Sequence, residues 1–425
     1  MTNPPDTLLF VNAAEVATCT GPVRQTDSAD PSAVHQCTAV AVRDGLVVGV
    51  GAQADVLARY PDAEQIDCAG GTLTPGLVDS HTHAVFGRFR TEEYALRCQG
   101  VPYMEIARRG GGINASVRDL RARNEDELVE MALPRLAEML ALGTTTAEVK
   151  SGYGLDTESE LKTLRAIRRL MEMQPIDLVP TFLGAHEFPP EHRASAEDRA
   201  RYVDLLVGEM IPAVAASGLA RFCDVFMEPG VFDGPQTERI LRAGLDHGLR
   251  PKLHADELEG SGAAELAVAL GAASADHLGA VSEAGIAALA SSSTVATLLP
   301  ATLFFLGRPR WAPGRALIDA GATVALATDF NPGSSPTPNL AFVMTAACSR
   351  MGFSPAEALR AATAGGAAAL ELADGRGTLR PGAPADLVLW RTASAAEIPY
   401  RLAAPICAGV WKAGVHVSPG VAPRR

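Results

Sequence analysis

The sequence predicts an α/β protein with a (β/α)8 barrel and a small β-sandwich domain formed by both ends of the chain. Eight strand-like apolar runs alternate with helical segments in the middle of the chain, and short runs of alternating apolar and polar residues occupy both ends. The expected boundaries are 1–74 plus 376–425 for the sandwich and 75–375 for the barrel. A length of 425 residues suits one barrel of roughly 250 residues with a smaller unit beside it.

The alternating runs at the chain ends predict short strands. The first segment contains TLLFVNAAEV, TAVAVRDGLVVGVG and QIDCAGGTLTPG, separated by turns that contain Gly or Asp. The C-terminal part repeats the pattern in GTLRPGAPADLVLW and ICAGVWKAGVHV. A period of two with tight turns indicates antiparallel strands, and we expect the two ends to pair into one β unit.

The middle of the chain contains eight apolar runs of strand length. They cover residues 77–83, 143–150, 177–186, 222–227, 250–256, 273–278, 294–300 and 323–329. Helical segments lie between them; in residues 124–143, Asn124 can cap a helix, acidic residues fill the first turn and Gly143 follows the last turn. Strands that alternate with helices pair in parallel, which favours a closed barrel. An open doubly wound sheet is the alternative, but no GxGxxG motif follows the first run.

The charge and hydropathy of the chain exclude several classes of partner. Its net charge of −12 argues against nucleic acid, because binding a phosphate backbone needs a basic surface. No apolar run reaches about 18 residues and no basic, apolar leader is visible, so we expect no membrane span and a cytoplasmic protein. Seven scattered cysteines without a C-x-x-C pair indicate neither a disulfide framework nor a thiolate metal site.

Polar residues capable of chemistry recur at the C-terminal ends of the predicted barrel strands. They are His81, His83, Lys150, His186, His254, His277 and Asp329. In a barrel these ends share one face, which is where active sites are built. His81 and His83 stand two residues apart in LVDSHTH, so on a strand they would point to the same side, about 7 Å apart. Together with His254 and Asp329 they can surround a Zn²⁺ or Fe ion and leave a position open for water.

Longer motifs surround these residues. Four of them are TPGLVDSHTH, HADE at 254–257, SADHL at 274–278 and TDFNPGSS at 328–335. Five more are FGRFR at 86–90, GGGI at 110–113, KSGYGL at 150–155, FLGAHE at 182–187 and LLPATLFFLG at 298–307. The first set resembles the amidohydrolase superfamily, and the second resembles its imidazolonepropionase family over about residues 7–415. Arg88 and Phe89, in place of small residues, and Ala301, in place of glycine, depart from the family pattern.

The resemblance implies a ligand set and a set of substrate contacts. One Zn²⁺ or Fe ion per subunit would be bound by His81, His83, His254 and Asp329. The implied substrate contacts are Arg90, Tyr153, His186, Glu257, Asn331, Gly333 and Ser334. The implied substrate, 4-imidazolone-5-propanoate, has a carboxylate that suits the planar double donor of Arg90. Tyr153 stands in a Gly-flanked turn, and the NPGSS loop can offer amide and hydroxyl donors to the substrate. The resemblance also implies a homodimer.

The implied reaction is the hydrolytic opening of this cyclic amide to N-formimidoyl-L-glutamate, a step of histidine degradation. It needs an activated water, an oxyanion stabiliser and an acid for the departing nitrogen. Glu257 is expected to move protons between water and the ring nitrogen. His277 could bind the nucleophile or the developing oxyanion, and Asp329 could share the role of base. The division of roles among these three residues stays open, and His186 is expected to contact the substrate rather than the metal.

Other interpretations of the same residues remain open at this point. Lys150 is expected to be a structural or supporting residue, and a carbamylated lysine that bridges two ions is the alternative. An aminohydrolase acting on a cytosine- or guanine-like ring would share the metal motifs, but a neutral base offers no carboxylate to Arg90. A non-catalytic barrel is the third interpretation, against which the complete ligand set argues. The remaining histidines are expected to be ordinary surface or packing residues: His35, His192, His247 and His416.

Overall fold

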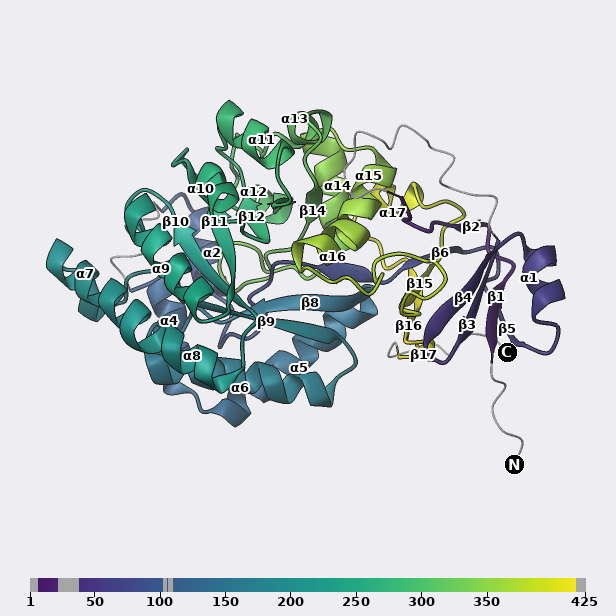
Figure 1. The fold of residues 1–425 in the computed structure, drawn as a ribbon, viewed down its shortest axis with the longest axis horizontal. Helices are drawn as coiled ribbons and strands as arrows, with labels where there is room; N and C mark the ends of the chain where they lie inside the picture. Colours follow the sequence, from purple (N-terminus) through teal and green to yellow (C-terminus); the bar gives the residue numbers. More distant parts are fainter. Residues whose placement is uncertain (1–6, 22–37, 102–104, 106–109, 418–425) are drawn as a thin grey trace.

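The computed structural model describes residues 7–21, 38–101, 105 and 110–417. Its centre is an eight-stranded parallel sheet in which the strands follow one another in chain order, from β7 to β14 (Figure 1). The strands are β7 (Leu77–Asp79), β8 (Thr144–Lys150), β9 (Asp177–Ala185), β10 (Phe222–Met227), β11 (Arg250–Ala255), β12 (Ser274–His277), β13 (Val295–Leu298) and β14 (Val324–Leu326). All eight predicted barrel strands are therefore confirmed.

The first and last strands meet just beyond their C-terminal ends. Thr82 forms a parallel bridge with Phe330. The backbone N–H of Asp329 donates to the carbonyl of His81 at 3.0 Å, and that of His83 donates to the carbonyl of Phe330 at 2.8 Å. These contacts close the sheet into the predicted (β/α)8 barrel, and the closing seam passes through three of the proposed metal ligands.

Two strand boundaries differ from the prediction in a way that bears on the site. The strand β7 ends at Asp79 rather than at residue 83, and β14 ends at Leu326 rather than at residue 329. His81, His83 and Asp329 therefore lie on the connecting segments that follow the strands. The apolar pattern continues past the last ladder pair because these segments are buried as well, so burial alone could not mark where pairing stops.

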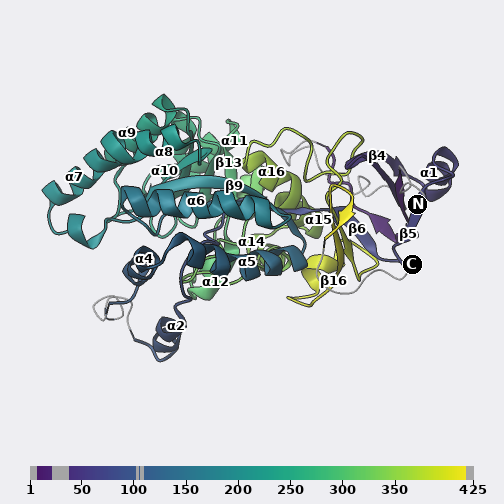
Figure 2. The ribbon, with the colours of Figure 1, turned by 90° about the horizontal axis from the view of Figure 1, so that it is seen from below.

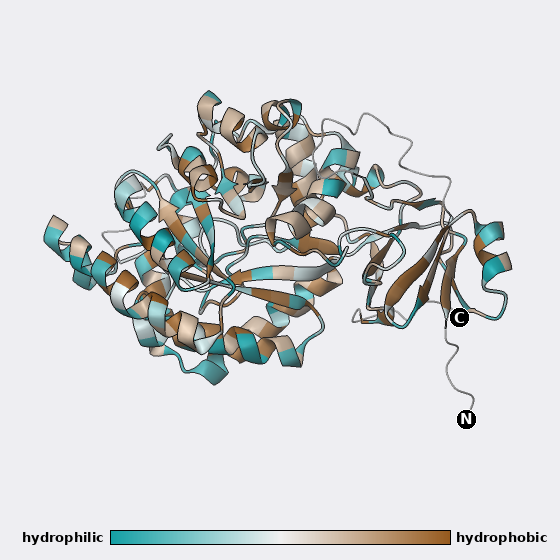
Figure 3. Cartoon of the chain, viewed as in Figure 1, coloured by the Kyte–Doolittle hydropathy of each residue, from teal (hydrophilic) through white to brown (hydrophobic). Residues whose placement is uncertain are grey.

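Helices cover the outside of the barrel, as Figures 1 and 2 show. They are α2 (Thr91–Cys98), α4 (Ile113–Ala122), α5 (Glu125–Ala141), α6 (Thr157–Met173), α7 (Ala196–Leu205), α8 (Ile211–Ser217), α9 (Gly234–Asp246), α10 (Ala263–Ala269), α11 (Glu283–Ala290), α12 (Pro300–Phe305), α13 (Gly314–Asp319), α14 (Leu340–Met351), α15 (Pro355–Arg360) and α16 (Gly366–Ala369). The predicted cap is confirmed: Asn124 and Glu127 form a capping box at the start of α5. The hydrophilic residues of these helices face outward and the strands are mostly hydrophobic (Figure 3).

The two chain ends form two further sheets beside the barrel. One has the order β4-β3-β1-β5 and the other β17-β16-β15-β6-β2. Their elements are β1 (Leu8–Val11), β2 (Glu15–Val16), β3 (Ala39–Arg43), β4 (Leu46–Gly51), α1 (Gln53–Arg59), β5 (Glu64–Asp67), β6 (Thr72–Pro75), β15 (Leu387–Trp390), α17 (Glu397–Tyr400), β16 (Cys407–Lys412) and β17 (Val415–His416). The pairing of β6 with β15 confirms that the ends meet. The domain boundaries at residues 74 and 376 stay a prediction.

The expectation of antiparallel strands throughout this unit is wrong in two places. The strand β1 pairs with β5 in parallel, and β2 pairs with β6 in parallel. The core between the two sheets includes Phe10 and Trp411, whose rings meet edge to face with centroids 5.0 Å apart. Alternation of apolar residues reports which face of a strand is buried but not its direction, so the sequence could not separate the two kinds of pairing.

Among the described residues, the longest helices fall short of the length and apolar character needed to cross a bilayer.

Candidate functional site

A cluster of imidazoles and one carboxylate fills the mouth of the barrel. Oδ1 of Asp329 lies 3.6 Å from Nε2 of His81 and 3.6 Å from Nε2 of His83. The ring centroid of His254, near the end of β11, lies 4.5 Å from that of His81 and 5.7 Å from that of His83. The structure thus brings together the four residues proposed as metal ligands.

Two more histidines adjoin these four. Among the described residues, ligand atoms within 4.8 Å of one another define four groups with shared members, and three of them contain at least two histidines. These groups are His81, His254 and His277; His83, His186 and His254; and His81, His83 and Asp329. His81 and His254 link the groups, so the donor atoms surround one centre.

The donor atoms suit a cation. Nε2 of His81, of His254 and of His277 is buried without a hydrogen-bond partner among the described residues. Burial, reinforced by the neighbouring cationic side chains, holds the pKa of His81 and of His83 well below its usual range, so both rings are neutral. A neutral imidazole is the form that binds a metal. Three imidazoles and a carboxylate match the donor set of zinc and of other first-row ions.

Asp329 is held by a second contact. Its Oδ2 accepts a hydrogen bond from the hydroxyl of Thr302 at 2.6 Å, while Oδ1 faces the histidines. Burial raises the pKa of the Asp329 carboxyl to about 6, and the bond from Thr302 opposes the rise. The residue has a left-handed backbone with φ of 53°, which turns the chain sharply after β14.

Two aspartates orient two of the proposed ligands. Nδ1 of His81 lies 2.7 Å from Oδ2 of Asp276, and Nδ1 of His254 lies 3.1 Å from Oδ1 of Asp224. A carboxylate at Nδ1 makes this nitrogen the donor, so Nε2 carries the lone pair. The sequence interpretation missed both aspartates, although each stands on a strand at the alternate positions that point into the barrel.

Lys150 lies beneath the histidines, in the interior of the barrel. Its side chain is fully buried, and Nζ lies 2.6 Å from Asp224 and 2.8 Å from Glu148. Lys252, which the sequence interpretation also missed, lies 3.0 Å from the other oxygen of Glu148. The contacts of Lys150 are those of an ammonium group, consistent with the supporting role expected for it.

Tyr153 and His186 form one wall of the site. The His186 ring stacks on His83 with centroids 5.0 Å apart, and the Tyr153 ring lies 5.4 Å from His186. Nδ1 of His186 lies 2.9 Å from the carbonyl of Gly152, to which it donates. Gly152 has φ of 101°, and a Cβ there would lie 3.0 Å from that nitrogen, so the glycine permits the close approach.

Glu257 lies beside His277. Its Oε2 is 3.7 Å from Nδ1 of His277, and its side chain is only 13% exposed. Burial raises the pKa of Glu257 to about 8, and the charges of Asp329 and Glu228 add to the rise. Glu228 accepts backbone hydrogen bonds from residues 257, 258 and 259, which holds this segment in place.

Arg90 and the loop after Asp329 are packed together. A Cβ on Gly333 would lie 1.2 Å from Nη2 of Arg90, so the guanidinium lies directly on the glycine. The backbone N–H of Arg90 donates to the carbonyl of Pro332 at 3.1 Å, and Nε lies 3.8 Å from Glu93. The positive charge of Arg90 and the negative charge of Asp329 both act on the buried hydroxyl of Tyr153. Arg90 therefore belongs to the same electrostatic environment as the cluster.

Asn331 and Ser334 use their polar groups within this loop. The side-chain oxygen of Asn331 accepts the backbone N–H groups of Gly333 and Ser334, each at 2.8 Å. Its Nδ2 donates to the carbonyl of Asp329 at 2.6 Å and to the hydroxyl of Ser334 at 2.9 Å. The donors expected to reach a ligand thus preform the loop, and their contact with substrate stays a prediction.

The departures from the family pattern leave the cluster intact. Arg88 is 79% exposed, and Phe89 packs edge to face on Phe86. Ala301 is buried in α12, next to Thr302. His192, His247 and His416 lie outside the cluster, whereas His35 and Cys37 fall outside the described residues.

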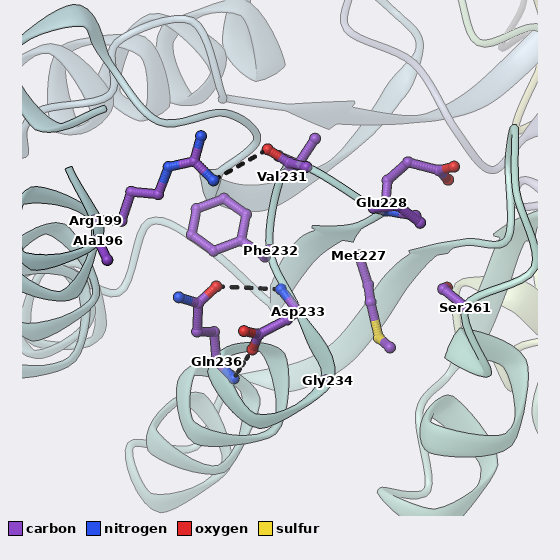
Figure 4. Close-up of a pocket in the computed structure, with 12 residues that line it drawn as sticks. Ala196, Arg199, Met227, Glu228, Val231, Phe232, Asp233, Gly234, Gln236 and Ser261 are labelled. Atoms are coloured by element: carbon purple, nitrogen blue, oxygen red, sulfur yellow. Dashed lines mark hydrogen bonds between the residues drawn. The ribbon is translucent and has the colours of Figure 1, made fainter. Parts of the chain in front are cut away.

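A separate cavity of about 490 Å³ lies at the segment that follows β10. Residues after β10 line it together with Arg199 and Ser261, as Figure 4 shows. Glu228 belongs to this lining and also binds the backbone of the Glu257 segment. Glu228 therefore links the cavity to the Glu257 segment, and none of the cluster histidines lines the cavity.

Comparisons with known proteins place the chain in a family. The sequence model of the amidohydrolase family matches residues 72–417. An imidazolonepropionase of Symbiobacterium thermophilum is 47% identical over 96% of this chain and 97% of its own length, and one of Myxococcus xanthus is 47% identical over 96% of both. A solved adenosine deaminase from Xanthomonas campestris with bound zinc covers 98% of this chain and 93% of its own, with a TM-score of 0.68 and 21% identity, which is a likeness of fold. The chain therefore belongs to the amidohydrolase family, among its imidazolonepropionases.

Proposed function

We propose that this protein is the hydrolase that opens the ring of 4-imidazolone-5-propanoate to give N-formimidoyl-L-glutamate, in histidine degradation. The observation that carries the proposal is the pairing of two features at one barrel mouth. A buried cluster of neutral imidazoles with Asp329 suits a metal ion, and the guanidinium of Arg90 offers a partner for the propanoate carboxylate. The curated relatives with the same name match nearly the whole chain.

We infer that His81, His83, His254 and Asp329 hold one Zn²⁺ or Fe ion in each subunit. When bound, such an ion lowers the pKa of a coordinated water and polarises a carbonyl oxygen. The unpartnered Nε2 atoms of His81 and His254 support this ligand set. Elemental analysis of protein purified without added metal would identify the ion and its stoichiometry.

The carboxyl of Glu257 supplies the proton for the departing ring nitrogen. Its pKa of about 8 keeps it protonated at neutral pH, as a general acid requires. In the overall reaction the elements of water add across the amide C–N bond: the nitrogen gains a proton, and the carbonyl carbon gains a hydroxyl to give a carboxylic acid, which releases a proton to become the carboxylate. Asp329 accepts the proton of the attacking water, and His277, with Nδ1 3.7 Å from Glu257, stabilises the developing oxyanion.

Substrate binding is assigned to Arg90 with its neighbouring loop and to the wall formed by Tyr153 and His186. Arg90 takes the propanoate carboxylate, and the preformed loop with Asn331, Gly333 and Ser334 surrounds it. Tyr153 and His186 lie against His83, and they contact the imidazolone ring of the substrate. Each of these groups is buried or half-buried, which removes water from around the reacting bond.

The test is an assay of the purified protein with 4-imidazolone-5-propanoate. Formation of N-formimidoyl-L-glutamate, detected by mass spectrometry, is the expected result. Release of ammonia from cytosine- or guanine-like heterocycles, with no turnover of the imidazolone, would assign the site to an aminohydrolase instead. Turnover of the imidazolone at the full rate after complete removal of metal would contradict the proposed ligand set.

We further infer a homodimer that works in the cytoplasm. The described cysteines are all free thiols, which suits a reducing compartment. Light scattering of the purified protein gives the oligomeric state, and fractionation of the source cells gives the location.

A further inference from the structure

Five charged side chains form a fully buried network under the histidines. They are Glu148, Lys150, Asp224, Lys252 and Asp276, each with a side-chain exposure of 0%. They come from β8 and from the three adjacent strands β10, β11 and β12, at positions that point into the barrel. Buried charges are costly unless they are paired and hydrogen-bonded, so a network of this size in a barrel core needs a reason beyond packing.

Lys150 lies at the centre of the network. Its Nζ lies 2.6 Å from Oδ2 of Asp224, 2.8 Å from Oε2 of Glu148 and 3.8 Å from Oδ2 of Asp276. Lys252 differs: its Nζ donates to the carbonyl of Ser80 at 2.9 Å and contacts Glu148, and no ion pair joins it to Asp224 among the described residues. Lys150 is therefore the cation that holds Asp224.

Asp224 connects this lysine to a proposed metal ligand. Its Oδ1 accepts from the backbone N–H of His254 at 3.2 Å and lies 3.1 Å from Nδ1 of the same residue. The carboxylate therefore binds the lysine on one side and the imidazole on the other. With Nδ1 engaged from below, Nε2 of His254 points into the cluster and has no other partner among the described residues.

We propose that Lys150 is a positioning residue: its ammonium group fixes Asp224, and Asp224 fixes the ring and tautomer of His254 toward the metal. The inference rests on the ligand set given under the proposed function. It also sets aside carbamylation of Lys150, because that modification needs a neutral amine with free space, and Nζ is enclosed by three carboxylates within 3.8 Å. The lysine supports a site with one ion by remaining a cation.

The experiment measures metal retention rather than turnover. Lys150→Met, Asp224→Asn and the double variant are loaded with Co²⁺, and the visible absorption band and the dissociation constant against a chelator are recorded. We expect Lys150→Met to weaken binding by roughly 10- to 100-fold, with a shifted band, as for loss of a partner behind a metal-bound histidine. The double variant should bind no more weakly than Asp224→Asn, because both changes break the same connection.

Lys162→Met is the matched control. Nζ of Lys162 also donates to several groups, the carbonyls of Leu120, Arg121 and Arg123, and none of these residues belongs to the cluster. This variant should lose stability without a change in the Co²⁺ band. If Lys150→Met does not fold, the double variant removes both buried charges and keeps the comparison with Asp224→Asn available.

Two results would overturn the inference. One is a folded Lys150→Met protein with the wild-type dissociation constant and absorption band. The other is a double variant that binds metal at least tenfold more weakly than Asp224→Asn, because Lys150 would then act independently of Asp224. A wild-type protein that retains no metal would instead contradict the proposed function, so the two failures are distinguishable.

Discussion

Two histidines of the cluster, His254 and His186, differ in what lies at Nδ1. His254 has a carboxylate at Nδ1 and leaves Nε2 free, whereas Nδ1 of His186 donates to a backbone carbonyl. A carboxylate raises the basicity of the opposite nitrogen more than a carbonyl does, because it carries a full charge. This difference supports His254 as a metal ligand and His186 as a substrate contact.

Replacing Arg90 tests whether this residue binds the substrate carboxylate. Arg90→Ala should raise KM for the imidazolone by roughly 10- to 100-fold, because a hydrogen bond to a charged group contributes about 1.5–3 kcal/mol, and kcat should change less. Steady-state kinetics measure the two constants separately. Arg88→Ala, in the same segment but 79% exposed, is the control and should keep the wild-type KM. An unchanged KM in Arg90→Ala would remove this residue from the binding site.

Replacing Glu257 tests whether its carboxyl donates the proton to the departing ring nitrogen. Glu257→Gln keeps the shape of the side chain but cannot donate an acidic proton, so kcat should fall by roughly 10²- to 10⁴-fold with little change in KM. Metal content should stay at the wild-type level. Glu259→Gln changes an exposed carboxylate two residues away and should behave as wild type. Wild-type kcat in Glu257→Gln would assign the acid to another group.

The proposed metal ligands at the strand ends could be predicted from the sequence, but the buried charged residues beneath them in the barrel could not. His81, His83, His254 and Asp329 stand out because histidine and aspartate occur at or just after the C-terminal ends of apolar runs. Asp224 and Lys252 lie inside such runs, where an alternating charge can equally face solvent. Only the closed barrel shows that these alternate positions face one another across its interior.

The loop between Phe330 and Ser335 acts as one element because Asn331 holds it together. Its side chain binds the backbone on both sides, and Arg90 rests on Gly333. A loop fixed in this way presents the guanidinium without rearrangement, which lowers the entropic cost of binding a ligand. The NPGSS motif predicted a turn here, and the structure adds that the turn supports Arg90.

Replacing Gly333 tests whether the loop holds the guanidinium of Arg90 in position. In Gly333→Ala the new Cβ would meet the end of the Arg90 side chain, which is flexible, so the guanidinium should move while the fold remains. We expect KM to rise toward the value of Arg90→Ala, with the thermal midpoint within a few degrees of wild type and full metal content. Gly208→Ala places a methyl group in open space and is the control. A wild-type KM in Gly333→Ala would show that the position of Arg90 is not critical.

At the scale of the whole molecule, the barrel closes where the ligands lie. The order of the eight strands could be predicted because each strand after β7 follows a helix. The short parallel pairs β1–β5 and β2–β6 could not be predicted, since no local signal sets their direction. The seam between the first and last strands includes one bridge, a few backbone hydrogen bonds at residues 81–83 and 329–330, and two hydrogen bonds that Thr328 donates to the Asp79 carboxylate. A cation bound by His81, His83 and Asp329 would join both sides of this seam.

Removal of the metal should therefore loosen the seam more than the rest of the barrel. Chelated protein should keep its secondary structure by circular dichroism, because the core between sheet and helices does not involve the cluster. The backbone N–H groups of His83 and Asp329, which donate across the seam, should exchange with deuterium faster, while those between β10 and β11 keep the holoprotein rate. Metal at about 100 times its Kd should restore about 2.7 kcal/mol of stability. Equal acceleration in both regions would show that the ion stabilises the fold as a whole, and no acceleration in either would place it away from the seam.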